Sequence, residues 1–253
     1  MKHDAISFNK FINYSPDDEI WKPINNTEDK VAFEKLIQNV EYTKKHGTKK
    51  EKGDSLEELM DFIYNRFDFV KEVIHNRSTS DNQIDHIVIF LDYSMPKFIF
   101  DKTRGTLIGE SKNHNKSIGT REVSNLNQLL KVKDSDLGIF SAYNSFSRGK
   151  NMWCASEGVR RKLFLSDKKI IIGFNFEELK SLSHNNFYTL IQQKYNNLVD
   201  EIEDSFSDNG KVPYHEYLHE TILNMKKLGL MSEETYLECK LNIENRYGQL
   251  LDT

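Results

Sequence analysis

Hydrophobic residues recur along the chain first at the spacing of helices and then at the shorter spacing of strands. In residues 27–45 and 55–67 they stand three or four positions apart, which predicts two amphipathic helices with a loop at 46–54 between them. The next apolar segments are rich in Val, Ile and Phe, which is typical of β-strands. Strands are therefore predicted at 69–76, 83–91 and 106–113.

The second half of the chain alternates between helices and short apolar strands. After a stretch at 92–105 that holds a Pro and a Gly and is expected to be a loop, strands are predicted at 137–142 and 169–174. Helices are predicted at 120–132, 156–167, 175–182, 184–206, 214–228 and 232–247. This order predicts an α/β protein whose central mixed sheet is covered by helices. The two short strands lack polar alternation, so interior positions in the sheet are expected for them.

Composition limits the class of protein. The chain has 253 residues, of which 38% are hydrophobic and 29% are charged, enough apolar material for a packed core. No segment approaches the roughly 18 apolar residues of a membrane span, and the first residues lack the apolar run of a signal peptide. Cys154 and Cys239 fit no metal-binding spacing, so we expect a cytoplasmic protein. Three regions are expected: an N-terminal helical or loop segment at 1–50, a core at 51–183 and a helical C-terminal extension at 184–253.

The net charge of −4 argues mildly against a nucleic-acid-binding protein, but basic residues gather in places. Five lysines lie within residues 44–52, Arg148 and Lys150 share a loop with a glycine, and residues 160–162 are all basic. Such clusters are most often solvated faces, so they permit nucleic-acid binding without indicating it.

The stretch "TLIGESKN" places charges at the end of an apolar strand. Glu110 and Lys112 are two residues apart, so they share one face, and Asp85 stands just before the apolar run of the preceding strand. If the two strands pair, Asp85 and Glu110 lie close together and repel unless a cation lies between them. Mg²⁺ binds carboxylate and carbonyl oxygens, and the Ser111 carbonyl could add a ligand. With Lys112 placed to orient water or to stabilise charge on a phosphate, the pattern predicts metal-assisted phosphodiester hydrolysis.

These residues resemble the motif of the PD-(D/E)xK nuclease superfamily, and in particular the Mrr-like restriction endonucleases. Asp85 is followed by Glu110-Ser111-Lys112, and "KGDSLEELMDFIYNRF" is similar to the upstream helix that supplies a further Glu, here Glu57 with Glu58 as the alternative. The similarity covers roughly residues 53–180. Ile84 stands where the superfamily name has Pro, and the 25 residues from Asp85 to Glu110 are a long separation.

The resemblance implies a restriction-endonuclease-like fold, in which a helix precedes three strands and a helix and a strand follow. It also implies a Mg²⁺-dependent endonuclease, with Mn²⁺ able to substitute, that cuts double-stranded DNA in restriction or phage defence. Asp85 and Glu110 would bind the metal, Lys112 would position the attacking water, and Glu57 would support a second metal or orient Lys112. A homodimer would cut both strands, with the C-terminal helices as dimer surface or partner dock. DNA contacts are expected from Arg148, Lys150, Asn113 and Gln128.

Several alternatives remain open at this point. The three charges could be ordinary surface groups at strand ends, or the core could be a nuclease-fold subunit that binds nucleic acid or a protein without efficient cleavage. "HEYLH", residues 215–219, matches the zinc-binding pattern H-E-x-x-H, although an amphipathic helix explains it as well. His86 and His114 flank the candidate site and are expected to be structural, or to make a loose contact with phosphate, and not to act as a base.

Overall fold

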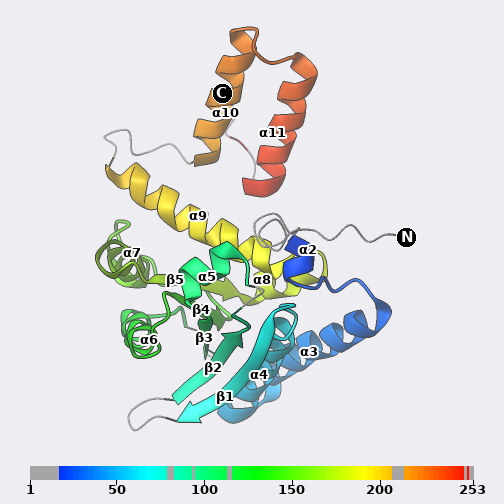
Figure 1. The fold of residues 1–253 in the computed structure, drawn as a ribbon, viewed down its shortest axis with the longest axis vertical. Coiled ribbons are helices and arrows are strands. Elements are labelled where there is room, and N and C mark those ends of the chain that lie inside the picture. Colours follow the sequence, from blue (N-terminus) through cyan, green and yellow to red (C-terminus); the bar gives the residue numbers. More distant parts are fainter. Residues whose placement is uncertain are drawn as a thin grey trace. The chain divides into compact units, whose positions relative to one another are not determined.

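The computed structural model of the chain describes residues 17–78, 83–92, 95–112, 116–206, 214–247 and 250. The protein is an α/β protein in which a five-strand mixed sheet is flanked by helices and followed by C-terminal helices (Figure 1). The chain forms two compact units, Met1–Tyr195 and Asn196–Thr253, and the division falls inside helix α9 (Phe187–Phe206). This confirms the predicted α/β class and the helical C-terminal part.

The strands lie side by side in the order of the chain. They are β1 (Val70–Ser78), β2 (Gln83–Phe90), β3 (Thr106–Lys112), β4 (Leu137–Ala142) and β5 (Ile170–Asn175). The first three are antiparallel, whereas β4 and β5 continue parallel to β3. Helix α6 (Thr120–Val132) connects β3 to β4, and α7 (Ala155–Asp167) connects β4 to β5, as parallel crossovers require.

The position expected for the last strand is wrong, because β5 is an edge strand. Its sequence nevertheless reads as an interior strand for a physical reason. Consecutive residues point to opposite faces, and Ile170, Ile171 and Ile172 are all buried, so both faces of β5 are covered. A strand without alternating polar residues is therefore covered on both faces, but it can still lie at the edge of the sheet with one neighbouring strand.

Two N-terminal helices, α3 (Thr27–His46) and α4 (Lys49–Tyr64), pack against each other. The loop predicted at 46–54 is wrong, since α4 begins at Lys49. Thr48 caps the helix: the Thr48 hydroxyl accepts from the Glu51 N–H at 3.3 Å, and the Glu51 carboxylate accepts from the Thr48 N–H at 2.7 Å. This capping box stabilises the first turn of a segment whose lysines and glycine suggest a loop.

Helices α4 and α6 cover opposite faces of the sheet (Figure 1). Two glycines on neighbouring strands mark the two contacts. A Cβ on Gly109 would lie 2.5 Å from the Tyr64 hydroxyl of α4, and a Cβ on Gly138 would lie 2.9 Å from Leu126 of α6. Both helices therefore approach the centre of the sheet more closely than a side chain at these positions would allow.

The core extends beyond the predicted central region at both ends. Trp21 follows the short helix α2 (Asp17–Ile20), is fully buried, and donates from Nε1 to the Ile63 carbonyl at 2.9 Å. Phe187, at the start of α9, is also fully buried, with its ring centroid 4.8 Å from that of Phe174. Between β5 and α9 lie α8 (Phe176–Lys180) and the 3₁₀ turn η1 (Ser181–Ser183). Residues on both sides of the predicted core thus belong to the first unit.

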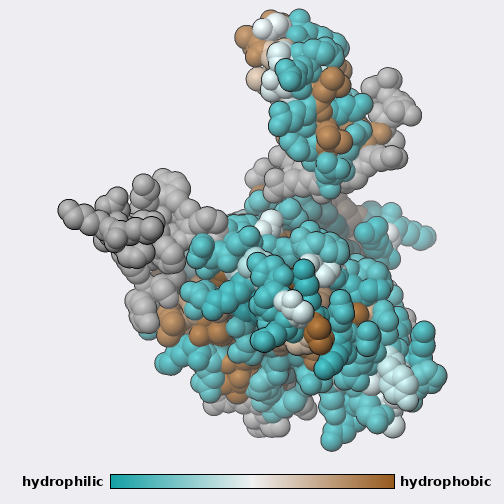
Figure 2. Space-filling model, turned by 90° about the vertical axis from the view of Figure 1, so that its right-hand side faces the viewer, coloured by the Kyte–Doolittle hydropathy of each residue, from teal (hydrophilic) through white to brown (hydrophobic). Residues whose placement is uncertain are grey.

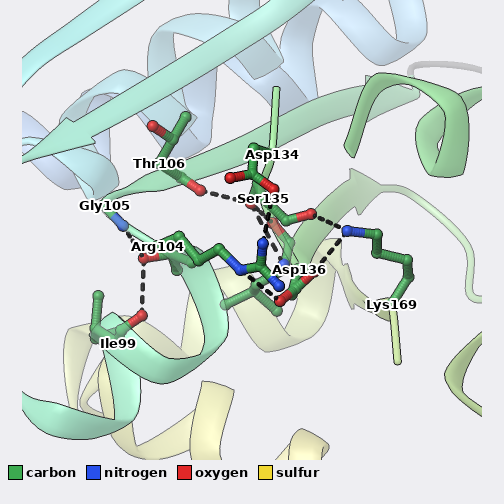
Figure 3. Close-up of polar contacts among 10 residues, drawn as sticks. Ile99, Arg104, Gly105, Thr106, Asp134, Ser135, Asp136 and Lys169 are labelled. Carbon is green, nitrogen blue, oxygen red and sulfur yellow. Dashed lines mark hydrogen bonds and ion pairs between the residues drawn. The ribbon is translucent and has the colours of Figure 1, made fainter. Parts of the chain in front are cut away.

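A charged network joins the amino ends of β3, β4 and β5 (Figure 3). It begins after α5 (Lys97–Thr103), a helix in the stretch predicted to be a loop. Arg104 contacts Asp134 at 2.7 Å and Asp136 at 3.2 Å, and the Lys169 ammonium contacts Asp136 at 2.5 Å. Lys169 also donates to the Ser135 carbonyl at 2.9 Å. At this end of the sheet, the positive charges of Arg104 and Lys169 are therefore paired with the negative charges of Asp134 and Asp136.

The second unit contains a helical hairpin formed by α10 (Tyr214–Lys227) and α11 (Glu233–Tyr247). The turn contains Gly229 at a φ of 71°, a conformation that glycine adopts readily. Figure 2 shows hydrophobic residues among hydrophilic ones on this hairpin, at the top of the view. Exposed apolar side chains here are Met225, Leu228, Leu230, Leu237 and Leu241. Of the helices in the described ranges, none is both long and apolar enough to cross a membrane.

Candidate functional site

The candidate site lies where β2 and β3 separate. Their pairing ends at His86 and Gly109, while β2 stays paired with β1 as far as Gln83, and β3 stays paired with β4 as far as Lys112. One step beyond the last β2–β3 pair, the register places Asp85 opposite Glu110. Residues in that relation have Cβ atoms about 5 Å apart in a regular sheet. The two carboxylates predicted to meet are thus brought together at a fork between strands.

A hydrogen bond from the main chain joins the two strands of the fork, and an ion pair lies within β3. The Asp85 carboxylate accepts a hydrogen bond from the Ser111 N–H at 2.7 Å, which ties β2 to β3 past the end of their ladder. Lys112 Nζ forms an ion pair with Glu110 Oε1, and these side chains are 25% and 13% exposed. Glu110 Oε2 is buried and has no hydrogen-bond partner in the part of the chain that the structure describes. An unsatisfied carboxylate oxygen at this depth is costly unless a cation or a donor reaches it.

Electrostatics at the fork favour an additional positive charge. Burial, followed by the negative charge of Asp85, raises the pKa of Glu110 to about 7 although Lys112 acts in the opposite direction. Burial alone would lower the pKa of Lys112, but the carboxylate of Glu110, with smaller effects from Asp85 and Glu122, raises it. One ammonium therefore does not neutralise the buried carboxylates, which is the situation that a bound divalent cation relieves.

Of the two glutamates considered on α4, Glu57 lies near the fork. Asn76 of β1 donates to Glu57 Oε2 at 2.9 Å. Burial is the main cause that raises the pKa of Glu57, and the charge of Asp85 adds to it. Glu58 is exposed and lines a hollow between α3 and α4. The helix thus places Glu57 near Asp85 and turns Glu58 towards the hollow between α3 and α4.

Three further residues support this arrangement and were not anticipated from the sequence. Gly109, the residue before Glu110, has no side chain, so the Tyr64 ring packs directly against the backbone of β3 there. Asn76 has a φ of 45°, a conformation that Asn tolerates better than most residues. Glu122, whose carboxylate accepts from the Gly119 N–H at the start of α6, lies near Lys112. Only the glycine in "LIGES" gives a visible sequence signal, because a glycine within an apolar strand often marks a close approach.

The remaining predicted contacts are placed differently. Arg148 and Lys150 are exposed on the loop after β4. This loop is paired with the segment before α6, since the Ser147 N–H donates to the Ile118 carbonyl at 3.0 Å. Gln128 is exposed on α6, about 9 Å further along the helix axis than Glu122, so the structure does not bring it to the fork. Asn113, like His114, lies outside the described residues.

The H-E-x-x-H pattern has a structural explanation in the second unit. His219 is buried on α10, and its Nε2 lies 3.0 Å from the Tyr236 hydroxyl of α11. The side chain of His215 lies outside the described residues. Hydrogen bonding within the hairpin thus accounts for His219.

Comparison of the chain with protein-family models, with curated proteins and with solved structures finds no match. The argument for function therefore depends on the geometry and chemistry of the fork.

Proposed function

We propose that the protein is a Mg²⁺-dependent endonuclease that hydrolyses phosphodiester bonds of double-stranded DNA. The observation that carries this proposal is the fork itself, where Asp85 and Glu110 stand opposite each other and Glu110 Oε2 is buried without a partner among the described side chains. The Lys112 ammonium is paired with the other oxygen of Glu110. Two carboxylates and one amine are the groups that such a hydrolysis requires.

The donor set fits Mg²⁺. Asp85 and Glu110 offer hard carboxylate oxygens, and the unpartnered Oε2 of Glu110 provides a ligand atom that no side chain claims within the described ranges. The Ser111 carbonyl stays a predicted third ligand. When bound, Mg²⁺ would supply positive charge at the scissile phosphate. Mn²⁺, with similar preferences, is expected to substitute.

The side chains at the fork then have separate tasks. Asp85, fixed by the Ser111 N–H, and Glu110, fixed by Lys112, hold their oxygens in place before the substrate arrives. The Lys112 ammonium orients the attacking water and stabilises negative charge that develops on the phosphate. Glu57, held by Asn76, would support a second metal or orient Lys112.

The fold supports the same proposal. Helix α4, the antiparallel strands β1–β3, helix α6 and the parallel strand β4 follow one another in the order that the resemblance to PD-(D/E)xK nucleases implies. Arg148 and Lys150 are exposed on the loop that follows β4. Because β3 and β4 are parallel, this loop starts at the same end of the strands as Lys112, so both residues are suited to contact DNA phosphates. A homodimer, with the exposed leucines of the hairpin as its interface, would allow both strands to be cut, in restriction or phage defence.

Plasmid cleavage tests this proposal. Wild-type protein is expected to nick or linearise plasmid DNA with Mg²⁺ and to be inactive with EDTA. Lys112→Ala should reduce the rate by about 100-fold or more, because the charge that stabilises the reacting phosphate is removed. Lys97→Ala is the matched control, since Lys97 is 70% exposed in an i,i+4 pair on α5. Circular dichroism spectra and melting temperatures of each variant check that folding is retained.

Equal cleavage by the wild type and Lys112→Ala would refute the assignment of this site. Mg²⁺-independent binding of DNA, without cleavage by the wild type, would instead indicate a nuclease-fold subunit that binds nucleic acid.

A further inference from the structure

A second group of potential metal ligands lies on the face of the sheet that α4 covers. His75 of β1 and His86 of β2 are paired in the register, so their side chains share that face, and Asp61 of α4 reaches them. Asp61 Oδ1 is 3.0 Å from His75 Nδ1 and 3.4 Å from His86 Nε2. The three ligand atoms all lie within 4.8 Å of one another. Three separate elements therefore bring two imidazoles and a carboxylate to one point.

We propose that Asp61, His75 and His86 bind one transition-metal ion of the Zn²⁺ class. Zinc bonds to nitrogen and oxygen are about 2.0–2.1 Å long, so ligand atoms of a tetrahedral site stand about 3.3 Å apart. The two distances from Asp61 lie close to that separation. The third separation, between the two ring nitrogens, is at most 4.8 Å, and rotation of the His75 side chain, which is 43% exposed, can shorten it.

An independent observation separates this group from an ordinary His–Asp contact. Asp61 Oδ1 is buried and makes no hydrogen bond within the described chain, although two imidazole nitrogens lie near it. The ring nitrogens are thus not aligned to donate to this oxygen. Two imidazole nitrogens and a carboxylate oxygen that lie this close without hydrogen-bonding one another are arranged as potential ligands of a shared centre.

His86 has one competing contact, which does not prevent coordination. Its Nε2 lies 3.2 Å from the Glu57 carbonyl. That carbonyl belongs to the interior of α4, where main-chain oxygens accept the hydrogen bonds of the helix, so it keeps a partner if Nε2 binds a metal. The His86 side chain is only 1% exposed, so its ring is held in place by packing and need not be ordered on binding.

The two sites differ in the metal they favour. The fork offers only oxygen ligands, which suit Mg²⁺, whereas two imidazoles and one carboxylate suit Zn²⁺ and its neighbours. Access is from the side of His75 and Asp61, which are 43% and 30% exposed, and a water can complete the coordination there. An ion at this position would join α4 to β1 and β2, next to the turn of α4 that carries Glu57.

Zinc titration of the full-length protein tests the inference. After removal of metals with a chelator, we expect isothermal calorimetry to show one Zn²⁺ per chain, and Co²⁺ to give the absorption spectrum of a low-coordinate nitrogen and oxygen site. His75→Ala and Asp61→Asn should each weaken Zn²⁺ binding by at least about 10-fold. Both residues are partly exposed, so these variants are preferred to changes at buried His86. His184→Ala, at an exposed histidine after η1, is the matched control.

The outcome is independent of the nuclease proposal, because an Asp85→Asn variant should retain zinc binding even if DNA cleavage is lost. Zinc binding should also raise the melting temperature of the wild type and not that of His75→Ala. The inference is overturned if the wild type binds no Zn²⁺, or if His75→Ala and Asp61→Asn bind it as tightly as the wild type.

Discussion

At the amino end of β3, each charged side chain of the network has a partner of opposite charge. At its carboxyl end, the negative charges of the fork exceed the positive charge of Lys112. Arg104 and Lys169 both contact Asp136, and Lys169 also donates to a main-chain carbonyl (Figure 3). At the other end, Glu110 keeps one buried oxygen without a partner among the described residues, and its pKa is raised.

The difference teaches how the same types of side chain serve different purposes. A balanced network stabilises the ends of three strands through pairs among its own charged groups. A fork with excess negative charge costs stability, and such sites persist when the charge has a task, such as holding a cation. The unbalanced end is thus the better candidate for chemistry.

The largest effect is expected from the same substitution made at both ends. Asp85→Asn should reduce Mg²⁺-dependent DNA cleavage by about 10²- to 10³-fold, because it removes a charged group from the reacting centre. Asp136→Asn should leave the cleavage rate of folded protein unchanged and lower the free energy of unfolding, since Lys169 loses its carboxylate partner. Cleavage rates and urea unfolding of both variants measure the contrast. If Asp136→Asn abolished cleavage in folded protein, the two ends would not differ as argued.

The next effect concerns stability against pH. The pKa of Glu110 is raised from 4.5 to about 7, so the folded state holds its proton more tightly than the unfolded state. The associated stabilisation is present below pH 4.5 and is lost as the pH rises through 7, up to about 3 kcal/mol. Glu110→Gln has no such proton, and its unfolding free energy should therefore fall less over this range.

Urea unfolding without divalent cations, over a pH series that brackets both values, measures this difference. Glu58→Gln is the exposed control on α4. If the unfolding free energies of the wild type and Glu110→Gln change with pH in the same way, the pKa of Glu110 is not raised in the folded state.

The smallest effect is expected at Arg104. Its side chain is 55% exposed and its partner Asp134 is 79% exposed, so water screens the pair. Arg104→Ala should lower the free energy of unfolding by less than about 1 kcal/mol, because exposed ion pairs contribute little. Thermal unfolding at low and high salt measures this. A loss several times larger would mean that the network depends on Arg104 more than on the buried contact between Lys169 and Asp136.

The sequence by itself determined the five strands, most of the helices and the three charges of the fork, but not the start of α4 or helix α5. Residues 106–112 form the predicted strand, and the two-residue repeat of a strand places Glu110 and Lys112 on one side, as their ion pair shows. The helices at 120–132 and 214–227 also follow from the spacing of apolar residues. These features are local, because main-chain geometry fixes which near neighbours share a face.

The tertiary structure alone decided which distant residues meet. The choice between Glu57 and Glu58 depended on how α4 lies against the sheet, and the start of α4 depended on a capping interaction that competes with a loop-like composition. The meeting of Asp61, His75 and His86 depended on strand register and helix placement together. Contacts across many residues are set by packing and register, which the periodicity of one segment does not encode.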